Sequence, residues 1–282
     1  MKITKGATPA IFPELRGSLA GLRWPCFAEI KYDGEACLIG YHTTAPTKIF
    51  TSNKYGTMRT DWSKLDRIQD ILEDAGITEA VFLAELYYNS GKKGALYELL
   101  KNKDSDDLNL TIYDVGHLRW VDREMRGEST QLISRKEELG ELFQDNPEFL
   151  PKVHLAKDKA QAEAYFKQAT DDGYEGIVVK PLDGLLVRGP CNWVKMKFKD
   201  RTVYRVSKIS AVSQRIEIDV PTGQQASMDG LSIPVVVGCG VKVTNKYKKD
   251  IQVGDMVEIE HQGVLDSGSL RHPVFIQKVR KE

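Results

Sequence analysis

The stretch Lys31-Tyr32-Asp33-Gly34 decides how the rest of this chain is interpreted. Residues 26–30 and 36–41 flank it, and both segments are predicted to be short β-strands joined into a hairpin by a tight Asp-Gly turn. A lysine beside a carboxylate at the end of a strand is a candidate nucleophile if burial or nearby cations lower the pKa of its amine. The pattern Lys-x-Asp-Gly alone occurs by chance in roughly a few per cent of chains this long. Whether it marks a functional site therefore depends on residues elsewhere in the chain.

Charged and aromatic residues recur downstream inside apolar segments of β type. Glu85 lies within residues 81–87, where an unpaired charge is costly, and this predicts a role in a site. Lys195 and Lys197 are predicted on one face of a strand, because side chains alternate along it. The ordered set is Lys31, Asp33, Glu85, Tyr113, Glu175-Gly176 with Lys180, Lys195 and Lys197.

Helical periodicity appears in several stretches between these strands. Residues 61–75 predict an amphipathic helix with Asp61 as its N-cap, and residues 95–101 predict a short one. Capping boxes at Ser134-x-x-Glu137 and Asp158-x-x-Gln161 predict two more helices. Residues 1–24 lack periodicity and are expected to be an irregular lead-in.

The composition changes after residue 199. Residues 201–282 hold about five short strand-like runs separated by turn residues, which is typical of a small β-barrel of the size of an oligonucleotide-binding fold. We therefore expect two domains, residues 1–200 and 201–282. The stretch 221–231 is expected to be a loop.

The composition is that of an ordinary globular protein. Of 282 residues, 28% are charged and 41% are apolar, and 40 basic residues balance 40 acidic ones. No apolar run approaches the roughly 18 residues of a membrane span, and no signal peptide is apparent. The four cysteines and five histidines show no spacing typical of zinc sites, so we expect reduced thiols and a cytoplasmic protein.

Taken in order, these signals resemble the covalent nucleotidyltransferase superfamily, and within it the minimal ATP-dependent DNA ligases of the viral or bacteriophage type. Arg271-His272-Pro273 in the last segment adds to the resemblance. It implies an α+β fold: an adenylation domain of antiparallel sheets with helices, followed by an oligonucleotide-binding barrel. It also implies a monomer acting on nicked duplex DNA in repair or replication.

The resemblance assigns roles to the residues. Lys31 would attack the α-phosphorus of ATP to form a lysyl-AMP, Lys195 and Lys197 would clamp the phosphate and lower the pKa of Lys31, and Arg271 would close over the ATP phosphates. The remaining roles are Glu175 with Asp33 for Mg²⁺, Glu85 for the ribose or metal side, Tyr113 for stacking on adenine, and Glu29 for accepting from the adenine amine.

Two positions depart from the family pattern. The family has arginines that are associated with gripping the nick where this chain has Ala36 and Asn53. Lys54 or Arg59 would replace them only in part, since lysine does not make bidentate phosphate contacts. We therefore expect altered nick recognition and tolerance of RNA-containing ends. Further DNA contacts are expected from the basic run 242–249, at Lys246 and Lys248, and from residues 221–231.

Other classes share parts of this pattern. An RNA ligase uses the same first motif, whereas Arg271-His272-Pro273-x-Phe275 favours the DNA type. A GTP-dependent capping enzyme ends in an Asp-Lys pair that is not found here, and an NAD-dependent ligase needs an amino-terminal region for which the first 30 residues leave no room. A non-catalytic nucleic-acid-binding module would keep the basic barrel without needing the lysines and carboxylates together.

Overall fold

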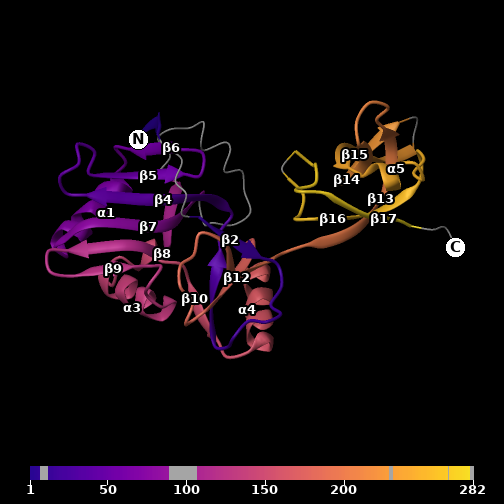
Figure 1. Ribbon diagram of the computed structural model, residues 1–282. Coiled ribbons are helices and arrows are strands. Elements are labelled where there is room, and N and C mark those ends of the chain that lie inside the picture. The colour runs from indigo at the N-terminus through magenta and orange to yellow at the C-terminus, as the bar shows by residue number, and fades with distance from the viewer. Residues whose placement is uncertain (7–11, 89–106, 229–230, 266, 280–282) are drawn as a thin grey trace. The chain divides into compact units, whose positions relative to one another are not determined.

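The computed structural model describes residues 1–6, 12–88, 107–228, 231–265 and 267–279. The chain divides into two compact units, Met1–Met196 and Lys197–Glu282 (Figure 1). The expected helix at residues 95–101 lies outside the described residues. No helix in the described part of the chain is long and apolar enough to cross a membrane.

The first unit contains a seven-stranded antiparallel sheet. Its strands, in hydrogen-bonded order, are β1 (Lys2–Lys5), β6 (Thr57–Thr60), β5 (Ile49–Asn53), β4 (Gly34–His42), β7 (Ile77–Tyr88), β8 (Leu108–Trp120) and β9 (Glu124–Arg126). β4 lies at its centre, where Ala36 pairs with Glu85 of β7. Glu85 in turn pairs with Thr111 of β8.

A second sheet of five strands completes the first unit. Its order is β10 (Val153–Ala156), β3 (Cys26–Lys31), β11 (Gly176–Pro181), β12 (Gly189–Lys197) and β2 (Pro13–Arg16). The antiparallel register of β3 with β11 places Gly176 opposite Lys31 and Val178 opposite Glu29. The residue after Glu175 is thereby fixed beside the candidate nucleophile.

The Lys31 stretch is the connection between these two sheets. β3 pairs with β10 and β11, whereas β4 pairs with β5 and β7, so the two strands that flank Lys31-Tyr32-Asp33-Gly34 are not partners. The predicted hairpin is therefore wrong. The strands themselves lie where the sequence predicts them, but strand pairing depends on distant segments that the local pattern does not reveal.

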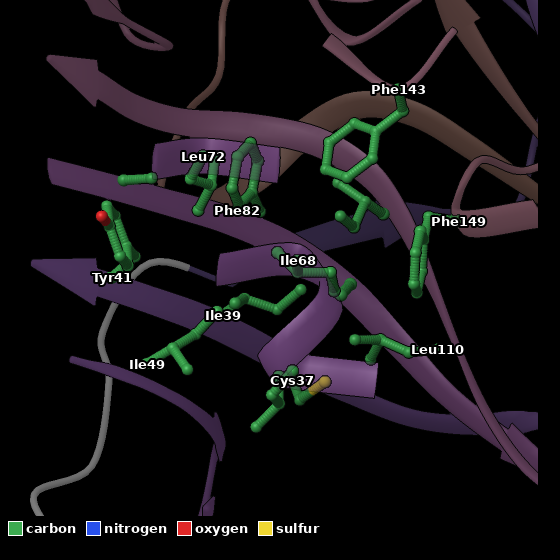
Figure 2. Packing of buried hydrophobic residues seen from close by; sticks show 14 of the residues in the cluster. Cys37, Ile39, Tyr41, Ile49, Ile68, Leu72, Phe82, Leu110, Phe143 and Phe149 are labelled. Atoms are coloured by element: carbon green, nitrogen blue, oxygen red, sulfur yellow. The ribbon is translucent and has the colours of Figure 1, made fainter. Parts of the chain in front are cut away.

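The helices cover the outer faces of the two sheets. α1 (Ser63–Asp74) and α3 (Leu132–Leu142) contribute to a core with the seven-stranded sheet, in which Ile68 and Leu72 lie among Ile39 and Phe82 (Figure 2). α4 (Lys159–Asp171) lies beside the other sheet (Figure 1). Its Ala162 and Ala169 are buried in the core that α4 shares with that sheet. The short 3₁₀ helix Pro147–Phe149 adds Phe149 to the first core.

The inner faces of the two sheets share a third hydrophobic cluster. Leu38 and Leu83 of the seven-stranded sheet pack with Cys191 and Trp193 of β12, and Tyr113 packs against them. On β3, Ala28 and Ile30 belong to the α4 core. Because side chains alternate along a strand, Glu29 and Lys31 face the opposite way, toward the inner cluster.

The helix ends agree only in part with the local signals. Asp158 is the N-cap of α4, since its carboxylate accepts from Gln161 N at 2.9 Å. α1 instead begins after Trp62, with Asp61 at a φ of 52°, and α3 begins after Gln131, so Ser134 lies inside its first turn. The segment expected to be an irregular lead-in contains β1 and β2.

The second unit is a five-stranded antiparallel sheet around its own core, to which twelve buried residues of the described part belong. Its order is β15 (Leu231–Lys242), β14 (Arg215–Met228), β13 (Asp200–Ile209), β16 (Met256–His261) and β17 (Val274–Lys278), with the short helix α5 (Asn245–Lys248). β14 and β15 pair beyond Pro221, up to Met228 opposite Leu231, so the expected loop 221–231 lies within a long hairpin. The closed oligonucleotide-binding barrel stays a prediction.

Candidate active site

Lys31 lies at the last position of β3, where the chain leaves one sheet for the other. Its ammonium is 2.6 Å from Glu175 Oε2, and the two side chains are 18% and 5% exposed. Glu175 immediately precedes β11, and Gly176 has a φ of 152°, a conformation that glycine adopts without strain. The Glu-Gly pair thus delivers a buried carboxylate to the lysine.

The charge around Lys31 is negative. Burial lowers the pKa of Lys31, but the carboxylates of Glu85, Glu175 and Asp33 together outweigh burial, and the net effect raises the pKa. The expectation that Lys195 and Lys197 lower this pKa stays a prediction, since the carboxylates named here account for the rise. A lysine in these surroundings is protonated at neutral pH. It could act as a nucleophile only after the negative charge around it had been reduced.

Gly34 is required by the close approach of β7. A Cβ at this position would lie 2.2 Å from the Leu86 carbonyl oxygen and 2.9 Å from Glu85 Cγ. A backbone oxygen cannot turn aside, so only glycine allows β4 to begin here. The same close approach places Glu85 at the Lys31 stretch, which fits the site role predicted for it.

A tyrosine cluster supports the Lys31 stretch. The rings of Tyr32 and Tyr87 stack at 4.4 Å with an interplanar angle of 21°. Tyr174 contacts Tyr32 edge-on at 5.9 Å. The cluster joins the residue after the candidate nucleophile to the end of β7 and to the residue before Glu175. No pattern in the sequence indicates this cluster, since isolated tyrosines in strands are common.

A second group of charges lies on the same face of β3 as Lys31. Glu29 is 2% exposed, and its two carboxylate oxygens are each 2.7 Å from an ammonium: Oε1 from Lys136 and Oε2 from Lys180. Both ammonium groups also donate to the Tyr113 carbonyl oxygen, at 2.9 and 3.1 Å. The structure therefore brings Glu29 and Tyr113, the two residues expected to contact adenine, to one place.

Lys180 is enclosed by aromatic rings as well. Its ammonium lies 4.8 Å from the centre of the Tyr113 ring and 4.2 Å from that of Trp193. Burial lowers its pKa to about 8, although Glu29 acts in the opposite direction. The pKa of Tyr113 is well above its ordinary value, chiefly because of burial, so its phenol stays neutral.

The other residues expected to bind the ATP phosphates lie on β12 and in the second unit. Lys195 is exposed on β12, two residues after Trp193, and by strand alternation it faces the same side as Trp193. Lys197 begins the second unit. Arg271 belongs to the second unit, in the segment between β16 and β17 that is tied by Arg271 N to Gly263 O at 2.9 Å. Their roles toward a nucleotide stay predictions.

One of the two departures from the family pattern, Asn53, belongs to a part-buried network. Glu35 Oε1 accepts from Asn53 Nδ2 at 2.5 Å, and Glu35 Oε2 accepts from Arg59 Nη2 at 2.7 Å. Asn53 Oδ1 accepts from the backbone N–H groups of Tyr55 and Thr57 and so shapes the turn between β5 and β6. Asn53 is thus a turn-forming residue in this structure.

The proposed DNA-binding side chains differ in their availability. Lys54 is exposed, with its ammonium 5.0 Å from the centre of the Tyr55 ring. Arg59 is 2% exposed and paired with Glu35, so burial prevents it from reaching a phosphate in this conformation. Lys248 donates to the carbonyl oxygens of Ser210 and Ser213. Lys246 lies in α5, where its backbone alone is described.

Few side chains near Lys31 are placed to bind a magnesium ion. Among the described residues, no group of three or more His, Cys, Asp or Glu side chains is arranged to hold a metal ion. Mg²⁺ that serves a nucleotide takes one or two carboxylates and completes its shell with phosphate oxygens and water. Glu175, buried beside Lys31, with Asp33 nearby, supplies donors of that kind.

Comparison with known proteins gives one family match. The family model described as the ATP dependent DNA ligase domain matches residues 19–197, which include Lys31, Glu85, Tyr113, Glu175 and both late lysines. A search of curated proteins finds no match.

Several solved structures share the fold. Pmar-Lig_PreS3 has a TM-score of 0.66 at 18% identity, covering 90% of this chain and 63% of its own. A structure from an analysis of Lig E DNA ligases, which bind DNA with a minimal scaffold, has a TM-score of 0.63 at 15% identity, covering 90% and 93%. The ligase domain of LigD from M. tuberculosis has a TM-score of 0.53 at 16% identity, covering 95% and 93%. This chain therefore spans less than two thirds of Pmar-Lig_PreS3.

Proposed function

Because this chain belongs to the ATP-dependent DNA ligase family, we propose that it is a polynucleotide ligase that seals nicks in duplex DNA through a lysyl-AMP intermediate. The observation that carries the proposal is the position of Lys31, half-buried at the end of β3 with Glu175 at 2.6 Å and with Glu85 and Asp33 nearby. A solvated surface lysine would have none of these neighbours.

The proposed first step is attack of Lys31 Nζ on the α-phosphorus of ATP. A nitrogen–phosphorus bond forms, the bond to the bridging oxygen breaks, pyrophosphate leaves and the lysine loses its proton. Phosphoryl transfer depends mainly on position and on neutralising charge. Glu175 and Asp33 would hold Mg²⁺, which supplies positive charge toward the phosphates.

The later steps transfer AMP to the 5′-phosphate of the nick, and the 3′-hydroxyl then displaces it. We infer that residues 197–282 form an oligonucleotide-binding fold that serves the DNA, which is supported by five antiparallel strands around a separate core. Lys195, Lys197 and Arg271 are proposed to contact the ATP phosphates, and Lys54 is proposed to contact the DNA backbone.

The test uses α-labelled ATP or GTP with Mg²⁺ and no polynucleotide, followed by a denaturing gel. Label from ATP that remains on the protein and is absent in Lys31→Arg supports the proposal, since arginine keeps the charge beside Glu175 but is not a nucleophile. Lys159→Arg is the matched control, because Lys159 is 66% exposed on α4. Label from GTP alone would move the protein to the capping enzymes, and no label from either would refute the proposal.

A second proposal concerns the strand break itself. Ala36 and Asn53 replace arginines that the family uses at the nick, and Asn53 is occupied within the turn it shapes. We propose that the enzyme tolerates ribonucleotides next to the nick. Sealing would be compared on nicks with DNA or RNA on either side, and loss of every RNA-containing substrate would exclude the idea.

A further inference from the structure

Lys136 is a buried cation to which neither the sequence nor the proposed chemistry gives a role. It is the fifth residue of α3, and its side chain is 11% exposed. The adjacent Arg135 is fully buried on Asp114, with Nε and Nη2 at 2.7 and 2.9 Å from the carboxylate oxygens. Two consecutive residues of one helix thus bind two consecutive residues of β8, since Lys136 bonds the Tyr113 carbonyl.

The two cations differ in what they hold. Arg135 is satisfied by Asp114 and by the carbonyl oxygens of Gly127, Thr130 and Gly184, all of which are structural partners. Lys136 instead reaches Glu29 on β3, which belongs to the other sheet. It therefore links the helix, the strand that carries Tyr113 and the strand that carries Lys31.

Glu29 is shared by two ammonium groups, and one of its carboxylate oxygens can accept a further hydrogen bond. Two ammonium groups face one carboxylate, and a buried charge without compensation is costly. The Lys180 ammonium is also stabilised by cation–π contacts with the rings of Tyr113 and Trp193. Glu29 Oε1 contacts the Lys136 ammonium at 2.7 Å as an ion pair, but it accepts no hydrogen bond from the described residues. This buried oxygen therefore has acceptor capacity left for a donor.

We propose that Lys136 is a positioning residue for base recognition, which holds Glu29 and the Tyr113 backbone in place so that Glu29 Oε1 accepts the exocyclic amine of adenine. The proposal rests on the proposed function of this site as the ATP site. One ammonium fixes both the hydrogen-bond acceptor and the strand position that carries the stacking ring. A base with an oxygen at the same position presents an acceptor to the carboxylate and is disfavoured.

The test compares ATP with purine riboside triphosphate, which lacks only the 6-amino group. The rate of lysine labelling at subsaturating nucleotide measures kcat/KM for each. Wild type should prefer ATP by roughly ten- to a hundredfold, as expected for a hydrogen bond to a charged acceptor. In Lys136→Met the preference for ATP should fall to within about threefold, because Glu29 is no longer held in place. Lys136→Arg should retain part of the wild-type preference.

Two variants separate positioning from folding. Lys159→Met removes an exposed lysine from α4 and should keep the wild-type preference. Lys136→Gln, which can still donate to the Tyr113 carbonyl, serves if Lys136→Met fails to fold, and it should also weaken the preference. Thermal melting establishes that each variant is folded.

The outcomes are distinct. Equal slowing of both nucleotides in the Lys136 variants would overturn the proposal, since a structural role lowers both rates together. A wild type that labels equally well with both nucleotides would also overturn it, while leaving the ligase proposal standing. A wild type that takes no label from ATP would refute the ligase proposal and this one with it.

Discussion

At the residue scale, the candidate nucleophile is held in a resting state. The carboxylates around Lys31 raise its pKa although burial acts against them, and its ammonium pairs with Glu175. A free amine here would require that positive charge reach these carboxylates first. Under the proposed function, arrival of a nucleotide with its metal ion would be an event of this kind and would couple activation of the lysine to the presence of substrate.

Gly34→Ala tests the close approach of β4 and β7 beside the candidate nucleophile. The added Cβ would lie 2.2 Å from the Leu86 carbonyl oxygen, so β4 or β7 must move. We expect a loss of about 1–3 kcal/mol in the free energy of unfolding, measured by urea denaturation, together with slower lysine labelling. Gly140→Ala is the control, because its Cβ meets nothing within 4 Å, and it should be neutral or stabilising. Equal urea midpoints for Gly34→Ala and wild type would contradict this account.

The lowered pKa of Lys180 predicts that the free energy of unfolding depends on pH. Burial lowers its pKa from 10.5 to about 8, so between these values the unfolded chain keeps a proton that the folded protein has released. The unfolded state then binds more protons, and stability rises with pH across this window. Lys180→Met should lack this rise, which is on the order of 1–3 kcal/mol, and below the window the two proteins should differ by a constant amount.

The measurement is the urea midpoint of wild type and Lys180→Met at several pH values. The difference between the two proteins isolates Lys180 from the tyrosines that titrate at higher pH, such as Tyr87 with a pKa of about 12. Lys159→Met, at an exposed site, should follow wild type. Parallel curves for wild type and Lys180→Met would show that the pKa of Lys180 is not lowered by folding.

At the scale of elements, the site lies where strands from two sheets end. β3 ends at Lys31, β4 begins at Gly34, and β11 begins after Glu175. The stacked rings of Tyr32 and Tyr87, with Tyr174 edge-on, are the packing that holds these ends together. The distances between the candidate catalytic residues therefore depend on aromatic contacts as well as on strand hydrogen bonds.

Tyr87→Ala is expected to disturb this alignment. Loss of the ring removes a stacked aromatic contact, which contributes about 0.5–1.5 kcal/mol beyond its buried area. Displacement of the Lys31 stretch should slow lysine labelling roughly ten- to a hundredfold. Tyr87→Phe keeps the ring and should label at nearly the wild-type rate. If both variants were equally slow, the Tyr87 hydroxyl would be the important group.

The sequence allows the strands to be predicted better than their partners. Periodicity locates the strands around Lys31, Glu85, Tyr113 and Glu175, because alternation is a local property. That β3 and β4 lie in different sheets depends on β10, β11, β5 and β7, which are distant in the chain. At the α1 end, Asp61 has a φ of 52° and is not the cap, since backbone geometry decides the start of the helix.

The same limit applies to charged side chains. Arg59 and Lys136 look like exposed cations in the sequence, yet both are largely buried on carboxylates, Glu35 and Glu29. Each ion pair joins residues from separate strands or from a helix and a strand, so composition and spacing carry no sign of it. Lys31, Glu175 and Glu29 are identifiable because they lie beside strand motifs with a recognisable order.

At the scale of the whole molecule, the proposed chemistry is divided between two units. Lys31 and Glu175 belong to Met1–Met196, and Arg271 belongs to Lys197–Glu282. Each unit has its own hydrophobic core, so a change in one need not unfold the other. A role for Arg271 in the first step therefore has a specific signature, because it should affect one reaction step and spare the others.

Arg271→Ala is expected to slow formation of lysyl-AMP from ATP by roughly 100- to 1,000-fold, the range for removing a cation from a developing phosphate charge. Sealing of a nick that already carries the 5′-adenylate should stay near the wild-type rate, since no ATP phosphates are then present. Single-turnover labelling and single-turnover sealing of the adenylated nick measure the two steps separately.

Arg205→Ala provides the control for Arg271→Ala, because Arg205 is exposed on β13 in the same unit and should leave labelling from ATP unchanged. If Arg271→Ala slowed both steps equally, its role would be structural. That is a real alternative, since Arg271 N bonds Gly263 O and the following His272 has a φ of 48°, so this segment is a constrained turn. A lowered melting temperature in Arg271→Ala would accompany that result, whereas an unchanged one with slow labelling alone would place the guanidinium at the ATP phosphates.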